Sequence, residues 1–202
     1  MGGVTLETVK LSVRKLVEFV LRSGDIDSRY ADPGAMADGA KIHRKIQKLM
    51  GDRLGGAYKS EVPLKLRAEA GGVSILLQGR ADGIITGEDG SLTIDEIKST
   101  TLPFALFYRQ RDLHLGQAKC YAHMFLAGIP EPPEEIGVQL TYYQMESGEI
   151  EYFNYMFSRQ ELYDYFIEYA DGKFNKTAHG VFGASMKVEL INDGPFTVIL
   201  ED

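Results

Sequence analysis

Cysteine is nearly absent from this chain, which has Cys120 as its single cysteine among 202 residues. One cysteine excludes a disulfide framework within the chain and a cysteine-ligated iron–sulfur cluster. Long apolar runs are absent too, since no stretch reaches the ~20 residues that a membrane-spanning helix needs. Residues 16–21 form a short apolar run, but it contains Glu18 and lacks the pattern of a secretory signal. We therefore expect a cytoplasmic protein with no membrane partner.

An excess of positive charge is also lacking. Lys and Arg number 22 against 29 Asp and Glu, which gives a formal net charge of −7. A protein that only holds nucleic acid is usually basic, whereas a metal-dependent nuclease needs acidic ligands and neutralises phosphate with its metal. The charge therefore argues against a passive nucleic-acid binder and leaves a nuclease open. It predicts weak, strongly salt-dependent DNA binding, assisted by a DNA-gripping partner or a larger polypeptide.

What is present is the pattern of a mixed α/β domain over residues 1–172, followed by a C-terminal segment at 173–202. Apolar periodicity and turn residues predict helices at 8–22, 33–50, 112–127 and 158–170, and strands at 61–69, 73–80, 92–98, 136–144 and 150–157. Hydrophobic residues make up 44% of the chain, which is enough for an ordinary core. This order of elements predicts a sheet covered by helices.

Two neighbouring strands carry the most informative residues. Gly79-Arg80-Ala81-Asp82 ends one predicted strand, and Asp95-Glu96-Ile97-Lys98 ends the next. Because side chains alternate along a strand, Glu96 and Lys98 share a face that Asp82 can meet, while Asp95 points away. Two carboxylates and an ammonium can hold a divalent cation and activate a water beside a phosphate. A surface ion pair is the alternative, but the surrounding apolar residues indicate burial, and a buried lysine needs a partner.

Two helices contribute further candidates. His43 lies mid-helix, where the small residues Gly39 and Ala40 permit a close approach to the sheet. It is either a partly buried histidine or a third protein ligand whose nitrogen admits manganese as well as magnesium. Gln117 and Tyr121 are four apart and share a helix face. They are either a polar edge with a core aromatic, or groups that lie near the lysine and the nucleic-acid backbone.

Together, Gly79-x-x-Asp82, Glu96-x-Lys98 and Gln117-x-x-x-Tyr121, with His43 upstream, resemble the ordered motifs of the RecB-type branch of the PD-(D/E)XK nucleases. The flanking residues 13–27 and 138–143 are similar to the nuclease domain at the N-terminus of some bacterial XPD/DinG-like helicases. The resemblance implies a restriction-endonuclease-like core (α-β-β-β-α-β) with a mixed sheet flanked by helices. It also implies a Mg²⁺ or Mn²⁺ site and cleavage of single- or double-stranded DNA. Many relatives carry four cysteines for an iron–sulfur cluster, so this chain resembles the cluster-free members.

The same resemblance implies roles for individual residues. Asp82, Glu96, the Ile97 carbonyl and His43 would bind the metal; Lys98 would orient the water or stabilise developing charge; Gln117 would position Lys98 or the phosphate; Tyr121 would contact the nucleic-acid backbone. Glu61 is a candidate contact to a metal-bound water, and Arg80 and Lys119 are either phosphate contacts or solvated charges. The expected function is a DNA exonuclease in repair or recombination, with a helicase in the same polypeptide or complex, and with homodimerisation open. The alternative is a catalytically inactive nucleic-acid-binding module of a helicase.

The last 26 residues, 177–202, carry a second resemblance. The run from Gly180 to Thr197, with Gly194-Pro195 in it, is similar to the C-terminal segment of D-aminoacyl-tRNA deacylases. In that family a Gly-Pro pair helps to exclude L-amino acids at a dimeric active site, but the family's Ser- and Gln-bearing motif is not present here. A deacylase-like function of the tail, a fused fragment, a chimera and a coincidentally similar hairpin all stay open. We expect a C-terminal β-hairpin that extends the sheet or mediates dimer contacts.

Overall fold

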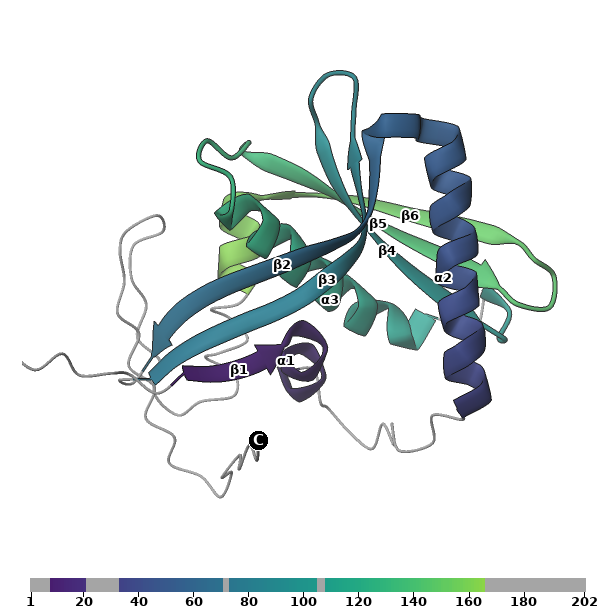
Figure 1. The fold of residues 1–202 in the computed structure, drawn as a ribbon, viewed down its shortest axis with the longest axis horizontal. Helices are drawn as coiled ribbons and strands as arrows, with labels where there is room; N and C mark the ends of the chain where they lie inside the picture. Colours follow the sequence, from purple (N-terminus) through teal and green to yellow (C-terminus); the bar gives the residue numbers. More distant parts are fainter. Residues whose placement is uncertain (1–7, 21–32, 71–72, 105–107, 166–202) are drawn as a thin grey trace, which may run out of the picture.

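The computed structural model describes residues 8–20, 33–70, 73–104 and 108–165, which form a six-stranded sheet with helices packed against it (Figure 1). Its elements are β1 (Thr8–Ser12), α1 (Val13–Val20), α2 (Pro33–Leu54), a 3₁₀ turn (Gly55–Ala57), β2 (Tyr58–Ala70), β3 (Val73–Thr86), β4 (Leu92–Thr100), α3 (Tyr108–Ala127), β5 (Glu135–Gln144) and β6 (Ile150–Ser158). Residues 159–165 are helical again. The predicted fold class, a mixed α/β sheet flanked by helices, is confirmed.

The long strand β3 organises the sheet. On one side β2 runs antiparallel to it, from Tyr58↔Ile85 to Ala70↔Val73. On the other side two strands share it: β1 pairs in parallel with Ser74–Gln78, and β4 pairs antiparallel with Gly83–Thr86. Residues 79–82 of β3 lie between these two partners, so the sheet forks there. Beyond β4 the sheet continues with β5, which is parallel to it, and β6, which is antiparallel to β5.

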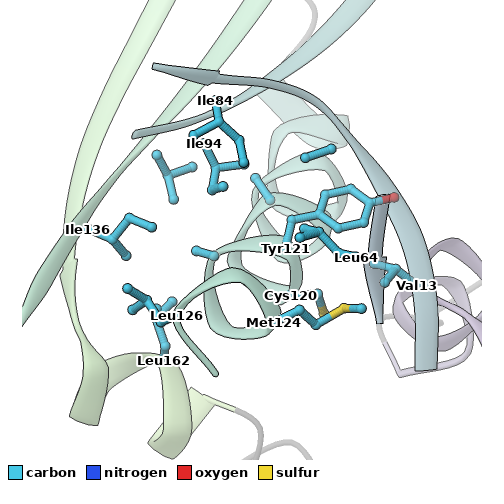
Figure 2. Close-up of a cluster of buried hydrophobic side chains, with 14 of the residues drawn as sticks. Val13, Leu64, Ile84, Ile94, Cys120, Tyr121, Met124, Leu126, Ile136 and Leu162 are labelled. Atoms are coloured by element: carbon cyan, nitrogen blue, oxygen red, sulfur yellow. The ribbon is translucent and has the colours of Figure 1, made fainter. Parts of the chain in front are cut away.

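Alternation along β4 separates two hydrophobic cores. Ile94 belongs to the larger core, which also takes in α1 and α3 residues (Figure 2). Ile97, of opposite parity, belongs to a smaller core with Ile46 and Met50 of α2. Helices therefore cover both faces of the sheet. The parallel strand β5 is buried from Ile136 to Gln144, as expected for a strand with both faces covered.

The expectation of a single helix over residues 8–22 is wrong at its start. Residues 8–12 form β1, and α1 begins only at Val13. The Ser12 hydroxyl accepts a hydrogen bond from the Lys15 amide at 3.2 Å, as an N-cap does. Val9 and Leu11 alternate with polar neighbours, and this short period of two was overlooked beside the helical pattern that follows.

The other elements within the described residues have the predicted type and shifted ends. The strand predicted at 73–80 continues to Thr86, and the one predicted at 61–69 begins at Tyr58. The predicted capping box is confirmed, because the Glu161 amide donates to Ser158 Oγ at 3.1 Å and Glu161 Oε2 accepts the Ser158 amide at 2.7 Å. The end of the last predicted helix, the tail hairpin and the boundary at 172/173 lie outside the described residues. No helix in the described ranges is long and apolar enough to cross a membrane.

Candidate functional site

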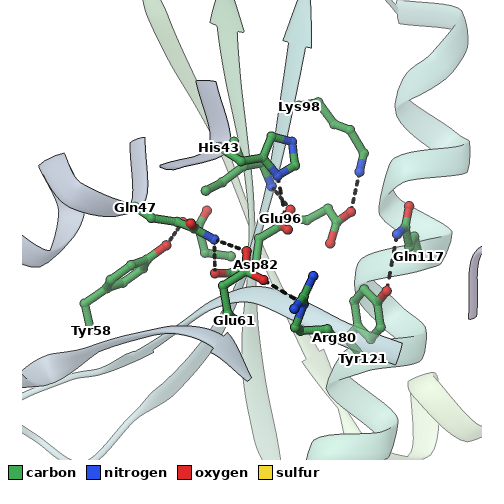
Figure 3. Close-up of polar contacts among 12 residues, drawn as sticks. His43, Gln47, Tyr58, Glu61, Arg80, Asp82, Glu96, Lys98, Gln117 and Tyr121 are labelled. Carbon is green, nitrogen blue, oxygen red and sulfur yellow. Dashed lines mark hydrogen bonds and ion pairs between the residues drawn. The ribbon is translucent and has the colours of Figure 1, made fainter. Parts of the chain in front are cut away.

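Asp82 lies at the fork of the sheet, where β3 leaves β4 (Figure 3). Its Oδ2 accepts a hydrogen bond from the backbone amide of Ile97 in β4 at 2.9 Å. This bond lies just beyond Gly83↔Asp95, the last backbone pair between β3 and β4. Continuing that register by one pair places Asp82 opposite Glu96. The fork thus brings the two predicted carboxylates together on adjacent strands.

Glu96, on the β4 side of the fork, is almost fully buried. Its Oε1 accepts a hydrogen bond from Lys98 Nζ at 2.5 Å, and the two side chains are 1% and 22% exposed. Within the described part of the chain, Glu96 Oε2 is buried and has no hydrogen-bond partner. A buried, unpaired carboxylate oxygen is costly and calls for an explanation such as an ion or a water.

The pKa values of the two carboxyl groups are shifted in opposite directions. Burial raises the pKa of Glu96 to about 7, Lys98 opposes this, and the charge of Asp82 adds to it. Burial also acts to raise the pKa of Asp82, but the hydrogen bond and charge of His43 and the charge of Lys98 outweigh it, so that pKa is lowered. Burial acts to lower the pKa of Lys98, yet the charges of Glu96 and Asp82 raise it overall. The site therefore combines one firmly ionised carboxylate, one carboxyl that ionises near neutrality and one ammonium.

Helix α2 brings His43 to the site. His43 Nδ1 lies 3.2 Å from Asp82 Oδ1. At Gly39 an added Cβ would lie 3.9 Å from Ser99 Oγ of β4, an ordinary contact distance, so α2 lies beside β4 there. The helix thus packs where the sequence places it, with His43 hydrogen-bonded to one of the two carboxylates.

Sequence reasoning overlooked Gln47 and underused Glu61. Gln47 Nε2 donates to Glu61 Oε1 at 2.7 Å and to the Asp82 carbonyl at 3.0 Å. Glu61 has φ of 55°, a left-handed conformation that costs energy in a non-glycine residue, and it interrupts the pairing between Ser60↔Gly83 and Val62↔Ala81. Gln47 therefore supports the backbone of Asp82 where the β2 ladder is broken. The available signal was its spacing, four residues after His43 on the same helix face.

The two cations considered as phosphate contacts both have partners within the protein. Arg80 Nε forms an ion pair with Glu61 Oε2 at 2.6 Å. Lys119 Nζ lies 4.5 Å from the ring centroid of Phe157 and 4.3 Å from that of Tyr165. Asp95 is fully buried and accepts hydrogen bonds from Thr141, Gln139 and Tyr58, in keeping with its exclusion as a ligand.

Tyr121 is a core residue rather than an exposed contact. It is 5% exposed, and Gln117 Nε2 donates to its hydroxyl at 3.4 Å. Its ring lies against Gly79, where an added Cβ would come within 2.6 Å of Tyr121 Cε1. The ring thus holds α3 against the strand that carries Asp82, and a contact of Tyr121 with a nucleic-acid backbone stays a prediction.

A pocket reaches Lys98 from the side of α1 and α3. Its volume is about 230 Å³, and it is lined by Arg14, Val17, Glu18, Lys98, Leu113, His114 and Gln117. This is below the ~300–1,000 Å³ of pockets for drug-sized ligands. Gln117 and Lys98 share this pocket, as their predicted proximity requires.

His114, beside this pocket, gives a test by pH. Its Nδ1 lies 3.0 Å from the Tyr142 hydroxyl, and burial, with a smaller effect of Lys98, lowers its pKa to about 3. Because the folded pKa lies below the unfolded value of about 6.5, His114 favours the fold above pH 6.5 and loses that contribution as pH falls toward 3. As the pH is lowered below 6.5, we expect the free energy of unfolding to fall more steeply for the wild type than for His114→Gln. The difference in slope should be up to about 1.4 kcal/mol per pH unit. Urea titrations at pH 7, 6, 5 and 4 measure this, and parallel curves would contradict it.

The residues at the fork fit a hard cation in part. Among residues 8–20, 33–70, 73–104 and 108–165, no three His, Cys, Asp or Glu side chains form a ready-made metal cluster. The fit rests on the unpaired Glu96 Oε2 and on the neighbouring Asp82 charge, since both would gain from a cation. His43 is turned to Asp82 in this arrangement, so its place as a third ligand stays a prediction.

Comparison with known sequences gives a partial match near the C-terminus. The model of the D-Tyr-tRNA(Tyr) deacylase family matches residues 139–201. Curated D-aminoacyl-tRNA deacylases of Cellvibrio japonicus and Caldicellulosiruptor saccharolyticus are 50% identical over 42 residues and 42% identical over 53 residues. These matches cover 21% and 24% of this chain, and 29% and 36% of the relatives, so the chain spans about a third of their length. The match to the family model begins within β5, well before the tail that carries the resemblance in the sequence.

Comparison with solved structures covers most of the chain. The crystal structure of SSO0001 aligns with a TM-score of 0.54 and 18% sequence identity over 86% of this chain and 80% of that one. A phage-related exonuclease from Haemophilus somnus 129PT aligns with a TM-score of 0.40 and 13% identity over 79% and 76%. The first similarity establishes a shared fold.

Proposed function

We propose that this chain is a metal-dependent nuclease that hydrolyses phosphodiester bonds in DNA. The observation that carries the proposal is the fork itself, where Asp82 and Glu96 lie on adjacent strands, Glu96 keeps one buried oxygen unpaired, and Lys98 holds the other. A buried carboxylate oxygen without a hydrogen-bond partner is costly, and a cation bound at Glu96 Oε2 would remove that cost.

The chain offers oxygen ligands of the kind that Mg²⁺ and Mn²⁺ prefer. Asp82, Glu96 and the Ile97 carbonyl would hold the ion, and the His43 nitrogen would add affinity for Mn²⁺. A cation bound there would polarise the phosphodiester and lower the pKa of a bound water.

The protein groups around the fork have distinct tasks. Lys98 remains an ammonium because Glu96 and Asp82 raise its pKa, so it can orient a water or stabilise charge that develops on the phosphate. Gln117 lines the same pocket and positions Lys98 or the phosphate. Gln47 holds the Asp82 backbone, and His43 holds its carboxylate.

Metal binding can be tested without measuring cleavage. We expect Mn²⁺ to raise the Tm of the EDTA-treated wild type, because an ion at 100 times its Kd stabilises a fold by about 2.7 kcal/mol. The Glu96→Gln variant should lose most of that rise. Glu88→Gln is the matched control, since Glu88 is exposed in the β3–β4 turn. Scanning calorimetry measures both rises in Tm. An equal rise for Glu96→Gln and the wild type would show that the ion binds at another site.

The substrate and setting are further parts of the proposal. We expect an exonuclease of repair or recombination that works in the cytoplasm with a helicase, in the same polypeptide or in a complex, and self-association remains to be measured. Cleavage assays on linear and circular DNA, each single- and double-stranded, distinguish an exonuclease from an endonuclease, because an exonuclease does not cut closed circles. Metal binding and DNA binding without cleavage of any of the four would favour the inactive module instead.

A second candidate function is hydrolysis of D-aminoacyl-tRNA. It is favoured by the deacylase match over residues 139–201. The sequence alignments cover only 29% and 36% of the matched relatives. The first part of residues 139–201 belongs to β5 and β6 of the six-stranded sheet. Release of D-tyrosine from charged tRNA by the full chain would support this candidate, and its absence beside active controls would reject it.

A further inference from the structure

Helix α2 has a basic outer face in a chain whose net charge is −7. Between Gly39 and Leu54 it carries five basic residues and a single acid, Asp52. Four of these cations are exposed and follow the helical spacing i, i+3, i+4, i+7: Lys41, Arg44, Lys45 and Lys48. This set is called the α2 basic stripe. The stripe concentrates positive charge on one helix face of a chain in which acidic residues outnumber basic ones.

The stripe begins beside the candidate site. His43 and Gln47 of the same helix contact Asp82, and each is followed in sequence by an outward cation, Arg44 and Lys48. The third face of the helix is apolar, with Ile46 and Met50 fully buried. Helix α2 therefore presents one face to the core, one to the site and one, charged positively, outward, where Lys45 Nζ also donates to the Tyr143 hydroxyl at 2.8 Å.

From this placement we infer that the α2 basic stripe binds the phosphate backbone of a DNA strand and leads it to the fork. The inference rests on the proposed nuclease function for its choice of ligand. From Lys41 to Lys48 the helix rises about 10 Å, the axial length of roughly three base pairs of duplex DNA, in which each strand carries one phosphate per about 3.4 Å of helix axis. A single row of cations matches a single row of phosphates, and charge complementarity provides the attraction in an otherwise acidic molecule.

The test is the salt dependence of DNA binding by the full chain without divalent metal. Each lost phosphate contact lowers the slope of log K against log[salt] by about 0.7 on a single strand. The double variant Arg44→Gln/Lys48→Gln should therefore bind fluorescein-labelled single-stranded DNA with a slope smaller by about 1.4 in fluorescence anisotropy. The matched control Lys65→Gln/Arg67→Gln removes the same charges from exposed positions of β2. These positions are about 13 and 20 Å along the strand from Glu61, and the control should keep the wild-type slope.

A second measurement needs no variant. In the wild type, DNA should protect Lys45 and Lys48 from amine acetylation while Lys59 and Lys65 stay reactive. Equal slopes for the two double variants, or protection spread evenly over the four lysines, would overturn the inference. Competition by polyglutamate as strong as that by DNA at equal charge would also overturn it, because the stripe would then prefer anionic chains in general. DNA binding with the expected slopes by a protein that cleaves nothing would uphold the stripe and reject the nuclease, so the two failures are distinguishable.

Discussion

Replacing Lys98 with methionine is expected to lower the rate of DNA cleavage by about 10²–10³-fold, the usual cost of removing one group that stabilises charge in the transition state. Methionine fills much of the space of the lysine stem, and the side chain it replaces is 22% exposed, so the fold should persist. Without the ammonium, Glu96 has no charge partner at Oε1. Its pKa of about 7 already reflects burial that Lys98 opposes, and loss of Lys98 would raise it further.

Initial rates on end-labelled DNA in Mn²⁺ measure this effect, with thermal unfolding as the check on folding. Lys59→Met is the matched control, because Lys59 is an exposed lysine on β2 and should retain full activity. Cleavage by Lys98→Met within threefold of the wild type would reject the role of Lys98. Cleavage by the wild type that persists in EDTA would reject metal dependence altogether.

Strand alternation made the centre of the site predictable. Residues two apart on a strand share a face, so the sequence alone predicts that Glu96 and Lys98 lie together and that Asp95 points away. The hydrogen bonds agree, since Lys98 binds Glu96 and Thr141 binds Asp95. The same local rule says nothing about which strand pairs with which. The fork at residues 79–82 depends on long-range pairing of β1 and β4 with one strand.

The missed features share that long-range origin. Glu61 takes a left-handed conformation inside a strand, and no propensity of glutamate predicts it. Gln47 is significant only because its amide meets both Glu61 and the Asp82 carbonyl. The motif of Tyr121 suggests a contact with DNA, but it does not reveal that the ring packs against Gly79. Motif residues thus divide into those that lie at the candidate site and those that pack the helices against the sheet.

Gly79 offers the sharpest test of the motif residues that act through packing. In Gly79→Ala the new methyl would come within 2.6 Å of Tyr121 Cε1 and 3.1 Å of Val13 Cγ2, closer than packed carbons approach. Overpacking of this kind costs about 1–3 kcal/mol. We expect Gly79→Ala to lower the free energy of unfolding by that amount, because both neighbours are buried core residues. Urea unfolding monitored by circular dichroism measures it.

The cause can be isolated with a double-mutant cycle. Tyr121→Leu removes the ring that meets the new methyl, so Gly79→Ala should cost at least about 1 kcal/mol less in that background, which is within the range of coupling between residues in contact. Gly51→Ala is the matched control with the opposite sign. A Cβ at Gly51, in α2, would meet nothing within 4 Å, and alanine should stabilise the helix by about 0.5–1 kcal/mol. Additive effects of Gly79→Ala and Tyr121→Leu would show that the glycine is needed for some reason other than its contact with the tyrosine ring. They would contradict the proposal that this contact holds α3 against the strand that carries Asp82.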